Sequence, residues 1–358
     1  METPPLYGLL GGDGLDDLRH VGDPEADRLV EELMASGNKT ALYYCLGSGN
    51  REEHCGALQV PEALTAFMCS GQLPTWANYS EMDRASEFFR SQCNEMLFLL
   101  GVLSLPYCYA AAKGAKALYL SEKIRSNTEL RLIDTALFIM EVMAPGAFTP
   151  GGAAYRSANQ VRLRHALARY YISRHPDFKN MGETPINQED MAGTNLAFSY
   201  IALGGLERIG KRPSQADKEA YVHLWAVIGH LMGVRDEVLA RDLRSAYWLE
   251  GRIRRRQFGV SEEGQSLMKS LAAHFRSNIP NRVTAALLPQ LLRYLLGNEV
   301  ASVLGIKAPL FRLGRLDPMA LLPVVRPLIF PPKAAYDVVM ELLRERRGDL
   351  VAALAPTG

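Results

Sequence analysis

Apolar residues recur at helical spacing along much of the chain, most clearly between residues 129 and 170. The segment Glu129–Met143 carries a stripe of leucine, isoleucine and methionine side chains three or four positions apart. The next segment, Ala144–Gly152, contains two prolines and three glycines, which strongly favour the end of a helix. Helical character resumes at Ala153 and continues to His175. The pattern therefore predicts a hairpin of two helices joined by a tight turn.

The rest of the chain also shows helical patterns and no strand-like alternation. Asp23 followed by Pro24 is typical of a helix start. Gln188–Ile209 is expected to form one helix although it contains three glycines. The apolar run Met96–Ala112 is shorter than the roughly 20 residues of a membrane span and is interrupted by proline. We predict that it forms a central buried helix kinked near Pro106, in an all-α fold with no transmembrane segment.

No linker, repeat or low-complexity stretch divides the 358 residues. We therefore expect one large helical domain over residues 1–358. Within it, residues 1–22 are expected to be irregular because they are rich in glycine. Residues 309–332 contain six prolines among apolar residues, and we expect them to wrap the core in short turns.

Charge and cysteine content exclude some functional classes and indicate a compartment. The net charge is +1, with 22% charged residues, so nothing indicates nucleic-acid binding or an acidic membrane surface. The N-terminal sequence lacks a basic segment followed by an apolar core, as a secretory signal would have. The five cysteines are odd in number and lack metal-type spacing. We expect a cytoplasmic protein whose thiols are reduced.

Two polar clusters interrupt the apolar hairpin. Arg131, Asp134 and Thr135 lie on one face of its first helix, and His165 and Arg169 lie one turn apart on the second. At about 1.5 Å per residue, Thr135 lies roughly 13 Å before the turn and His165 roughly 18 Å after it. The clusters therefore fall at similar depth, which is costly unless something is bound between them. The alternative is a buried histidine satisfied by a carboxylate, with solvated arginines.

The motif R-L-I-D-T, followed thirty residues after its threonine by V-R-L-R-H-A-L-A-R, resembles the signature of the latex clearing protein (rubber oxygenase) and MpaB-like oxygenase family. The segment Pro185–Ser199, P-I-N-Q-E-D-M-A-G-T-N-L-A-F-S, is similar to that family's block after the histidine helix. The resemblance implies an all-helical protein with a globin-like core. It also implies a haem b held by a histidine, and cleavage of carbon–carbon double bonds of isoprenoid chains with dioxygen.

By this resemblance, His165 is the proximal iron ligand, and Arg131 and Thr135 belong to the opposite, distal side. Asp134 stands where the rubber oxygenases have a lysine that can reach the iron, so that feature does not transfer. We group Asp134 with Arg131 and Thr135 as candidate catalytic residues, since its carboxylate could hold water or peroxide. The glutamate proposed as a base in rubber oxygenases has no clear counterpart here.

Three arginines on the histidine helix are candidates for cofactor contacts. Arg169, one turn beyond His165, is placed to meet a haem propionate bidentately, and a solvent-side salt bridge is the alternative. Arg162 and Arg164 point away from one another, so at most one of them can face a pocket. We include Arg162 with Arg169 as a predicted cofactor-binding residue.

The favoured hypothesis is a haem b-dependent oxygenase acting with dioxygen on a lipophilic, unsaturated small molecule. Its distal cavity is expected to be hydrophobic, with Leu137, Phe138 and Met140 on one side and Phe198 opposite. Two alternatives stay open. One is a haem peroxidase or monooxygenase on the same scaffold, because distal residues decide between these outcomes. The other is a non-catalytic helical protein that binds haem or lipid.

Overall fold

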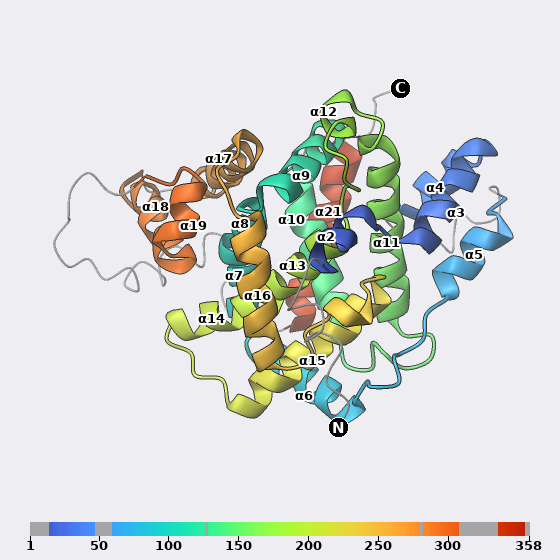
Figure 1. Cartoon of the computed structure of the whole chain (residues 1–358). Coiled ribbons are helices and arrows are strands. Elements are labelled where there is room, and N and C mark those ends of the chain that lie inside the picture. The colour runs from blue at the N-terminus through green and yellow to red at the C-terminus, as the bar shows by residue number, and fades with distance from the viewer. Residues whose placement is uncertain (1–13, 47–58, 126–127, 280–281, 308–335, 355–358) are drawn as a thin grey trace.

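The computed structural model describes residues 14–46, 59–125, 128–279, 282–307 and 336–354 (Figure 1). Within these ranges the secondary structure is helical, with one isolated bridge between Ala111 and Phe258, so the all-α prediction is confirmed. The helices are α2 (Gly14–Asp17), η1 (Leu18–His20), α3 (Pro24–Ala35), α4 (Lys39–Leu46), α5 (Glu62–Cys69), α6 (Tyr79–Ser91), α7 (Cys93–Leu99), η2 (Leu100–Ser104), α8 (Leu105–Tyr109), α9 (Ala112–Arg125), α10 (Thr128–Val142), α11 (Ala153–Ile172), α12 (Pro176–Lys179), α13 (Gln188–Phe198), α14 (Tyr200–Arg208), α15 (Gln215–Leu231), η3 (Asp236–Val238), α16 (Leu243–Gln257), α17 (Glu262–Ser277), α18 (Arg282–Leu296), α19 (Asn298–Val303) and α21 (Tyr336–Leu354).

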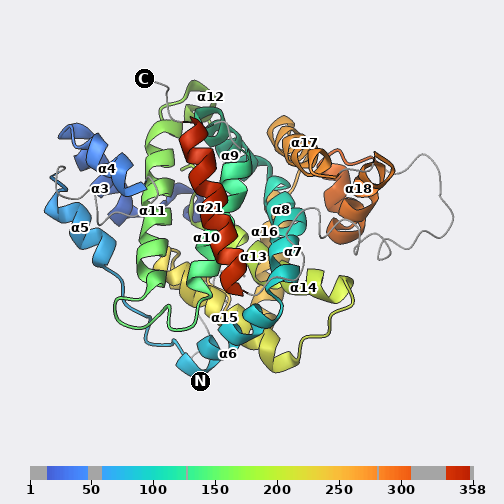
Figure 2. The ribbon, with the colours of Figure 1, turned by 180° about the vertical axis from the view of Figure 1, so that it is seen from behind.

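The predicted hairpin is formed by α10 and α11, which lie next to each other in the middle of the molecule (Figure 1). Gly146 and Gly151 in the turn have φ values of 70° and 76°, which glycine adopts at little cost. Seen from behind, α21 lies along the outer side of α10 (Figure 2). Its Tyr336 hydroxyl donates a hydrogen bond to the Met140 carbonyl of α10. The hairpin therefore forms a central wall with other helices on both sides.

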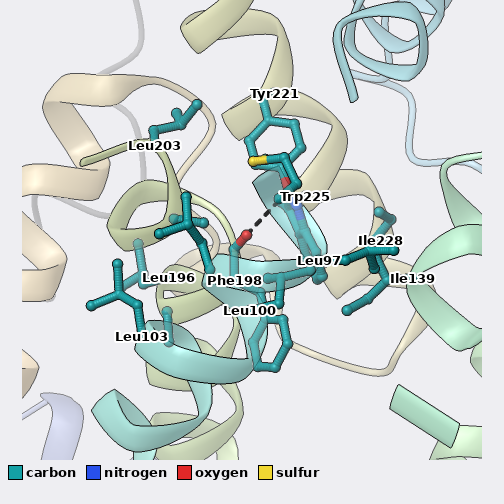
Figure 3. Packing of buried hydrophobic residues seen from close by; sticks show 14 of the residues in the cluster. Leu97, Leu100, Leu103, Ile139, Leu196, Phe198, Leu203, Tyr221, Trp225 and Ile228 are labelled. Carbon is teal, nitrogen blue, oxygen red and sulfur yellow. Dashed lines mark hydrogen bonds between the residues drawn. The ribbon is translucent and has the colours of Figure 1, made fainter. Parts of the chain in front are cut away.

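One continuous hydrophobic core includes residues from α2 to α21, and a smaller one joins α3, α4 and α5 to α11. Figure 3 shows the centre of the large core, where Phe198 of α13 packs against Trp225 of α15. The Tyr221 hydroxyl donates to the Phe198 carbonyl, which fixes α15 against α13. Full burial of such aromatic side chains stabilises the fold by roughly 1.5–3 kcal/mol each. These two helices provide a rigid support for the site described below.

Two predicted helices are divided in the structure. The apolar run 96–112 breaks before Pro106, which has no N–H to donate to the preceding turn. The backbone widens there into the π-helical turn η2, in which the Leu105 N–H donates to the Leu100 carbonyl. The expected helix over 188–209 divides at Ser199, whose hydroxyl donates to the Asn195 carbonyl. Each break lets a single apolar run change direction around the core.

Other expectations have mixed outcomes. Residues 14–20 of the segment expected to be irregular form α2 and η1, because Leu15 and Leu18 are buried in the core. The proline-rich stretch 309–332 lies outside the described residues. The four described cysteines are free thiols. In the described ranges, no helix is both long enough and apolar enough to cross a bilayer.

Candidate functional site

A cavity of about 450 Å³ lies within the helical assembly. Residues of α10 and α11 form one part of its wall, and residues of α8, α13 and α16 form another. The lining is mostly apolar and the volume is in the usual range of small-molecule sites. Phe138 and Phe198 line the cavity as predicted, whereas Leu137 and Met140 belong to the core cluster. The predicted hydrophobic pocket therefore exists, with a partly different lining.

His165 lies on the cavity wall and is partly accessible. Neither ring nitrogen hydrogen bonds to a described residue, and Nδ1 is buried. Burial lowers the pKa of His165 to about 4, aided by the cations Arg169 and Arg164 and opposed by Asp23. The imidazole is therefore neutral at physiological pH and keeps a lone pair available. The alternative considered above, in which a carboxylate satisfies the buried histidine, therefore does not apply: no carboxylate of the described residues hydrogen bonds to His165.

This neutral imidazole predicts a pH dependence of the ligand-free protein. In the unfolded chain His165 takes up a proton below about pH 6.5, but in the folded protein it does so only near pH 4. Between these values the unfolded state binds more protons, so the free energy of unfolding falls as the pH falls. Between pH 7 and pH 4.5, we expect the free energy of unfolding of His165→Gln to fall by roughly 1–3 kcal/mol less than that of the unmodified protein. Urea unfolding at both pH values measures the difference, and equal losses would contradict it.

Arg131 and Thr135 line the same cavity as His165. The Arg131 guanidinium donates to the Tyr109 hydroxyl and lies 5.5 Å from the centre of its ring. Thr135 Oγ1 donates to the Arg131 carbonyl at 2.8 Å. The hydroxyl proton of Thr135 is therefore used within α10, and its oxygen can still accept a hydrogen bond from a ligand.

Asp134 also lines the cavity, but it is paired with two arginines. Arg347 of α21 donates to Asp134 Oδ1 at 2.5 Å, and Arg164 of α11 lies 3.8 Å from Oδ2. A carboxylate held in this way is a weak candidate for moving protons. Asp134 instead ties α10 to α11 and α21.

Arg162 and Arg169 do not line the cavity. Arg162 donates to Asp23 at 2.7 Å and to Glu25 at 2.6 Å, and Arg169 donates to Asp27 at 2.6 Å. All three carboxylates belong to α3 or its N-cap. The contacts therefore place both arginines on the side of α11 that holds α3, instead of on the cofactor side where we predicted them. Arg164 is the member of the Arg162–Arg164 pair that lines the cavity.

The segment 185–199 builds the opposite wall and contains polar groups that we had not singled out. Glu189 is fully buried and accepts hydrogen bonds from Arg19, Arg256 and Gln257 at 2.8–3.0 Å. Burial raises the pKa of the neighbouring Asp190, and Arg19 opposes that rise. This network fixes α13 against η1 and α16 and so sets the shape of the cavity.

Two further groups of lining residues were missed. Tyr43 and Tyr171 line the cavity and are exposed, and a 2.9 Å hydrogen bond between their hydroxyls joins α4 to α11. On α16, Glu250, Arg254 and Gln257 line the cavity. The i, i+4, i+7 spacing of these three residues is the signal that indicates a shared face.

Comparison with known proteins agrees with this geometry. Residues 96–326, more than half of the chain, match the family described as ER-bound oxygenase mpaB/B′/rubber oxygenase, catalytic domain. The chain belongs to this oxygenase family. It is 25% identical over 294 residues to the rubber oxygenase of Streptomyces sp. (strain K30), covering 81% of this chain and 72% of that protein.

The fold of the family is shared as well. A solved structure of the latex clearing protein LCP in the closed state matches with a TM-score of 0.70 at 23% identity. The match covers 92% of this chain and 90% of the other. The resemblance read from the hairpin motifs is thus confirmed, and membership in an oxygenase family favours an enzyme over a purely structural protein.

Proposed function

We propose that this member of the family is a haem b-dependent oxygenase that cleaves a C=C bond of a lipophilic, isoprenoid-like small molecule. The observation that carries the proposal is His165, a neutral imidazole without protein hydrogen bonds among the described residues, on the wall of an apolar cavity. A neutral imidazole is a good iron ligand, and an unsatisfied one is costly unless a ligand compensates for it.

The residues present fit such a cofactor. His165 lies on the cavity wall and would be the protein ligand to the iron. Arg131 and Arg164 line the cavity, and guanidinium groups bind carboxylates such as haem propionates well. When bound, haem would supply a redox-active iron with one position open to dioxygen.

The chain itself prepares the surroundings of the reaction. Apolar side chains from Phe138, Phe198 and Trp225 exclude water and receive a hydrocarbon chain. Arg131, held by Tyr109, provides a fixed positive charge beside the Thr135 hydroxyl. Thr135 can accept a hydrogen bond, while Asp134 is neutralised by Arg347. These residues orient reactants, and we assign no proton transfer to Asp134.

The size of the cavity limits the substrate. A bound haem would take up most of the 450 Å³, so a substrate chain would have to extend towards the exposed lining residues Tyr43 and Tyr171. We expect unsaturated isoprenoids to change the absorption spectrum of the purified protein, because they bind beside the chromophore. Small charged metabolites should leave it unchanged. Titration followed by absorption spectroscopy measures both, and the reverse ranking would argue against a lipophilic substrate.

The decisive experiment combines the spectrum with isotope labelling. The purified protein should show an intense Soret band with about one haem per chain. Incubation with an unsaturated isoprenoid under ¹⁸O₂ should give two carbonyl products that each carry one labelled oxygen atom. Incorporation of ¹⁸O into only one atom of the products would instead support a haem monooxygenase. Turnover that needs peroxide would support the peroxidase, and the absence of a Soret band would refute the proposal.

A further inference from the structure

We propose that the α16 end of the cavity anchors the terminal hydroxyl group of the substrate, which is therefore an isoprenoid alcohol instead of a hydrocarbon. This inference rests on the proposed function and names the substrate class of the same site. It is carried by Gln257, a buried amide with an unused acceptor, and by the charge balance of the groups around it.

The polar groups of α16 lie along one face of that helix. Glu250, Arg254 and Gln257 are spaced i, i+4 and i+7, and all three line the cavity. The stretch from Glu250 to Gln257 covers roughly 10 Å of the helix axis. Tyr107 of α8 faces it, with its ring 4.8 Å from that of Phe258 and its hydroxyl donating to Glu250. A polar end thus closes a mostly apolar cavity, an arrangement that fixes the orientation of a ligand.

Gln257 is only 7% exposed, and the nitrogen of its side-chain amide is already hydrogen-bonded. Its Nε2 donates to Glu189 Oε2 at 2.8 Å. Because a carboxylate can only accept, the atom that faces Glu189 must be the amide nitrogen. Oε1 is therefore the atom that can still accept a hydrogen bond. Oε1 is buried and has no hydrogen-bond partner among the described residues. A ligand that donates a hydrogen bond here would remove the cost of the unsatisfied oxygen.

The charges around this oxygen argue against an anionic ligand. Arg254 Nε lies 3.3 Å from Glu250, and Arg254 Nη1 donates to Glu299 at 2.9 Å. One cation is therefore matched by two carboxylates, and the buried Glu189 beside Gln257 is itself paired with Arg19 and Arg256. The arginines named here are thus already paired with carboxylates, so an anionic head group gains little, whereas a neutral hydroxyl donates to Oε1 without bringing charge. Ethers and carbonyls cannot make this contact, because they only accept.

The position of α16 gives the anchor a consequence for the reaction. Residues of α16 and residues of α11, the helix that carries His165, line the same cavity. A chain held by its hydroxyl at α16 therefore extends through the cavity towards His165. The double bond that is cleaved would lie at a fixed distance from the hydroxyl group.

The test compares three ligands of equal chain length with the protein as purified. Farnesol donates and accepts hydrogen bonds, farnesyl methyl ether only accepts, and β-farnesene does neither. Quenching of tryptophan fluorescence gives the dissociation constants, since Trp225 lines the cavity. We expect farnesol to bind roughly 5–10-fold more tightly than the ether, as one hydrogen bond contributes. Gln257→Met, similar in shape but without the amide oxygen, should abolish this preference.

Gln265→Met is the matched control, because Gln265 of α17 donates to the Val303 carbonyl of α19 and does not line the cavity. It should keep the preference for farnesol. Equal affinity of the unmodified protein for all three ligands overturns the inference, and that comparison needs no variant. Loss of haem from Gln257→Met also overturns it, because α16 would then hold the cofactor. The absence of haem from the unmodified protein would refute the proposed function, whereas the fluorescence preference is measured independently of haem.

Discussion

Replacing His165 with alanine should give a protein that folds but no longer binds stoichiometric haem. The imidazole is neutral and unpaired among the described residues, so its removal costs little in the ligand-free protein but deletes the iron ligand. We expect the Soret band at one haem per chain to fall by at least tenfold, while the helical circular dichroism is retained. Haem content is measured by the pyridine haemochrome assay.

His274→Ala serves as the control, because His274 lies on α17 and does not line the cavity. It should keep full haem content. If His165→Ala retained haem with an unchanged spectrum, His165 would not be the ligand. His223 and His230 would then be the next candidates, although both lie edge-on to Trp76, away from the cavity lining.

Arg162→Met should reduce the free energy of unfolding by about 3–5 kcal/mol without reducing haem content, because it breaks a buried ion pair. Asp23, whose side chain is 5% exposed, would lose its partner at 2.7 Å. The contact of the guanidinium with the Phe67 ring, 4.8 Å away, would also be lost. Urea unfolding measures the stability, and the absorption spectrum measures the haem.

The double variant Asp23→Asn, Arg162→Met should recover part of the lost stability. Asparagine is neutral and can still cap α3, as the Asp23 side chain does through the Ala26 N–H. A stable Arg162→Met protein that had lost its haem would show instead that Arg162 contacts the cofactor. The pair of variants therefore separates a structural role of Arg162 from the cofactor role suggested by the sequence.

The sequence predicts what depends on local spacing. The hairpin of α10 and α11 follows from the apolar periodicity and the glycine turn, and the bounds agree within a few residues. The same spacing places Arg131, Thr135 and His165 on one cavity wall. The same three residues also belong to the motifs that resemble the family, so the cavity and the family were both predicted from them.

What depends on distant partners could not be predicted. Arg169 is one turn from His165, yet its direction is set by Asp27, 142 residues earlier in the chain. Sequence spacing identifies the face of a helix but not the helix that covers it. The same reason explains why the cavity lining on α16 was missed. Gln257 of that helix is held by Glu189 of α13, 68 residues earlier in the chain.

The pairing of Asp134 with Arg347 joins residues that are 213 positions apart. At a synthesis rate of about 5–20 residues per second, Arg347 is made roughly 10–40 s after Asp134. Residues 128–172, which form the hairpin, are therefore synthesised before α21, the helix that packs along the outer side of α10. The order of synthesis thus leaves Asp134 without its Arg347 partner until the last described helix has been made.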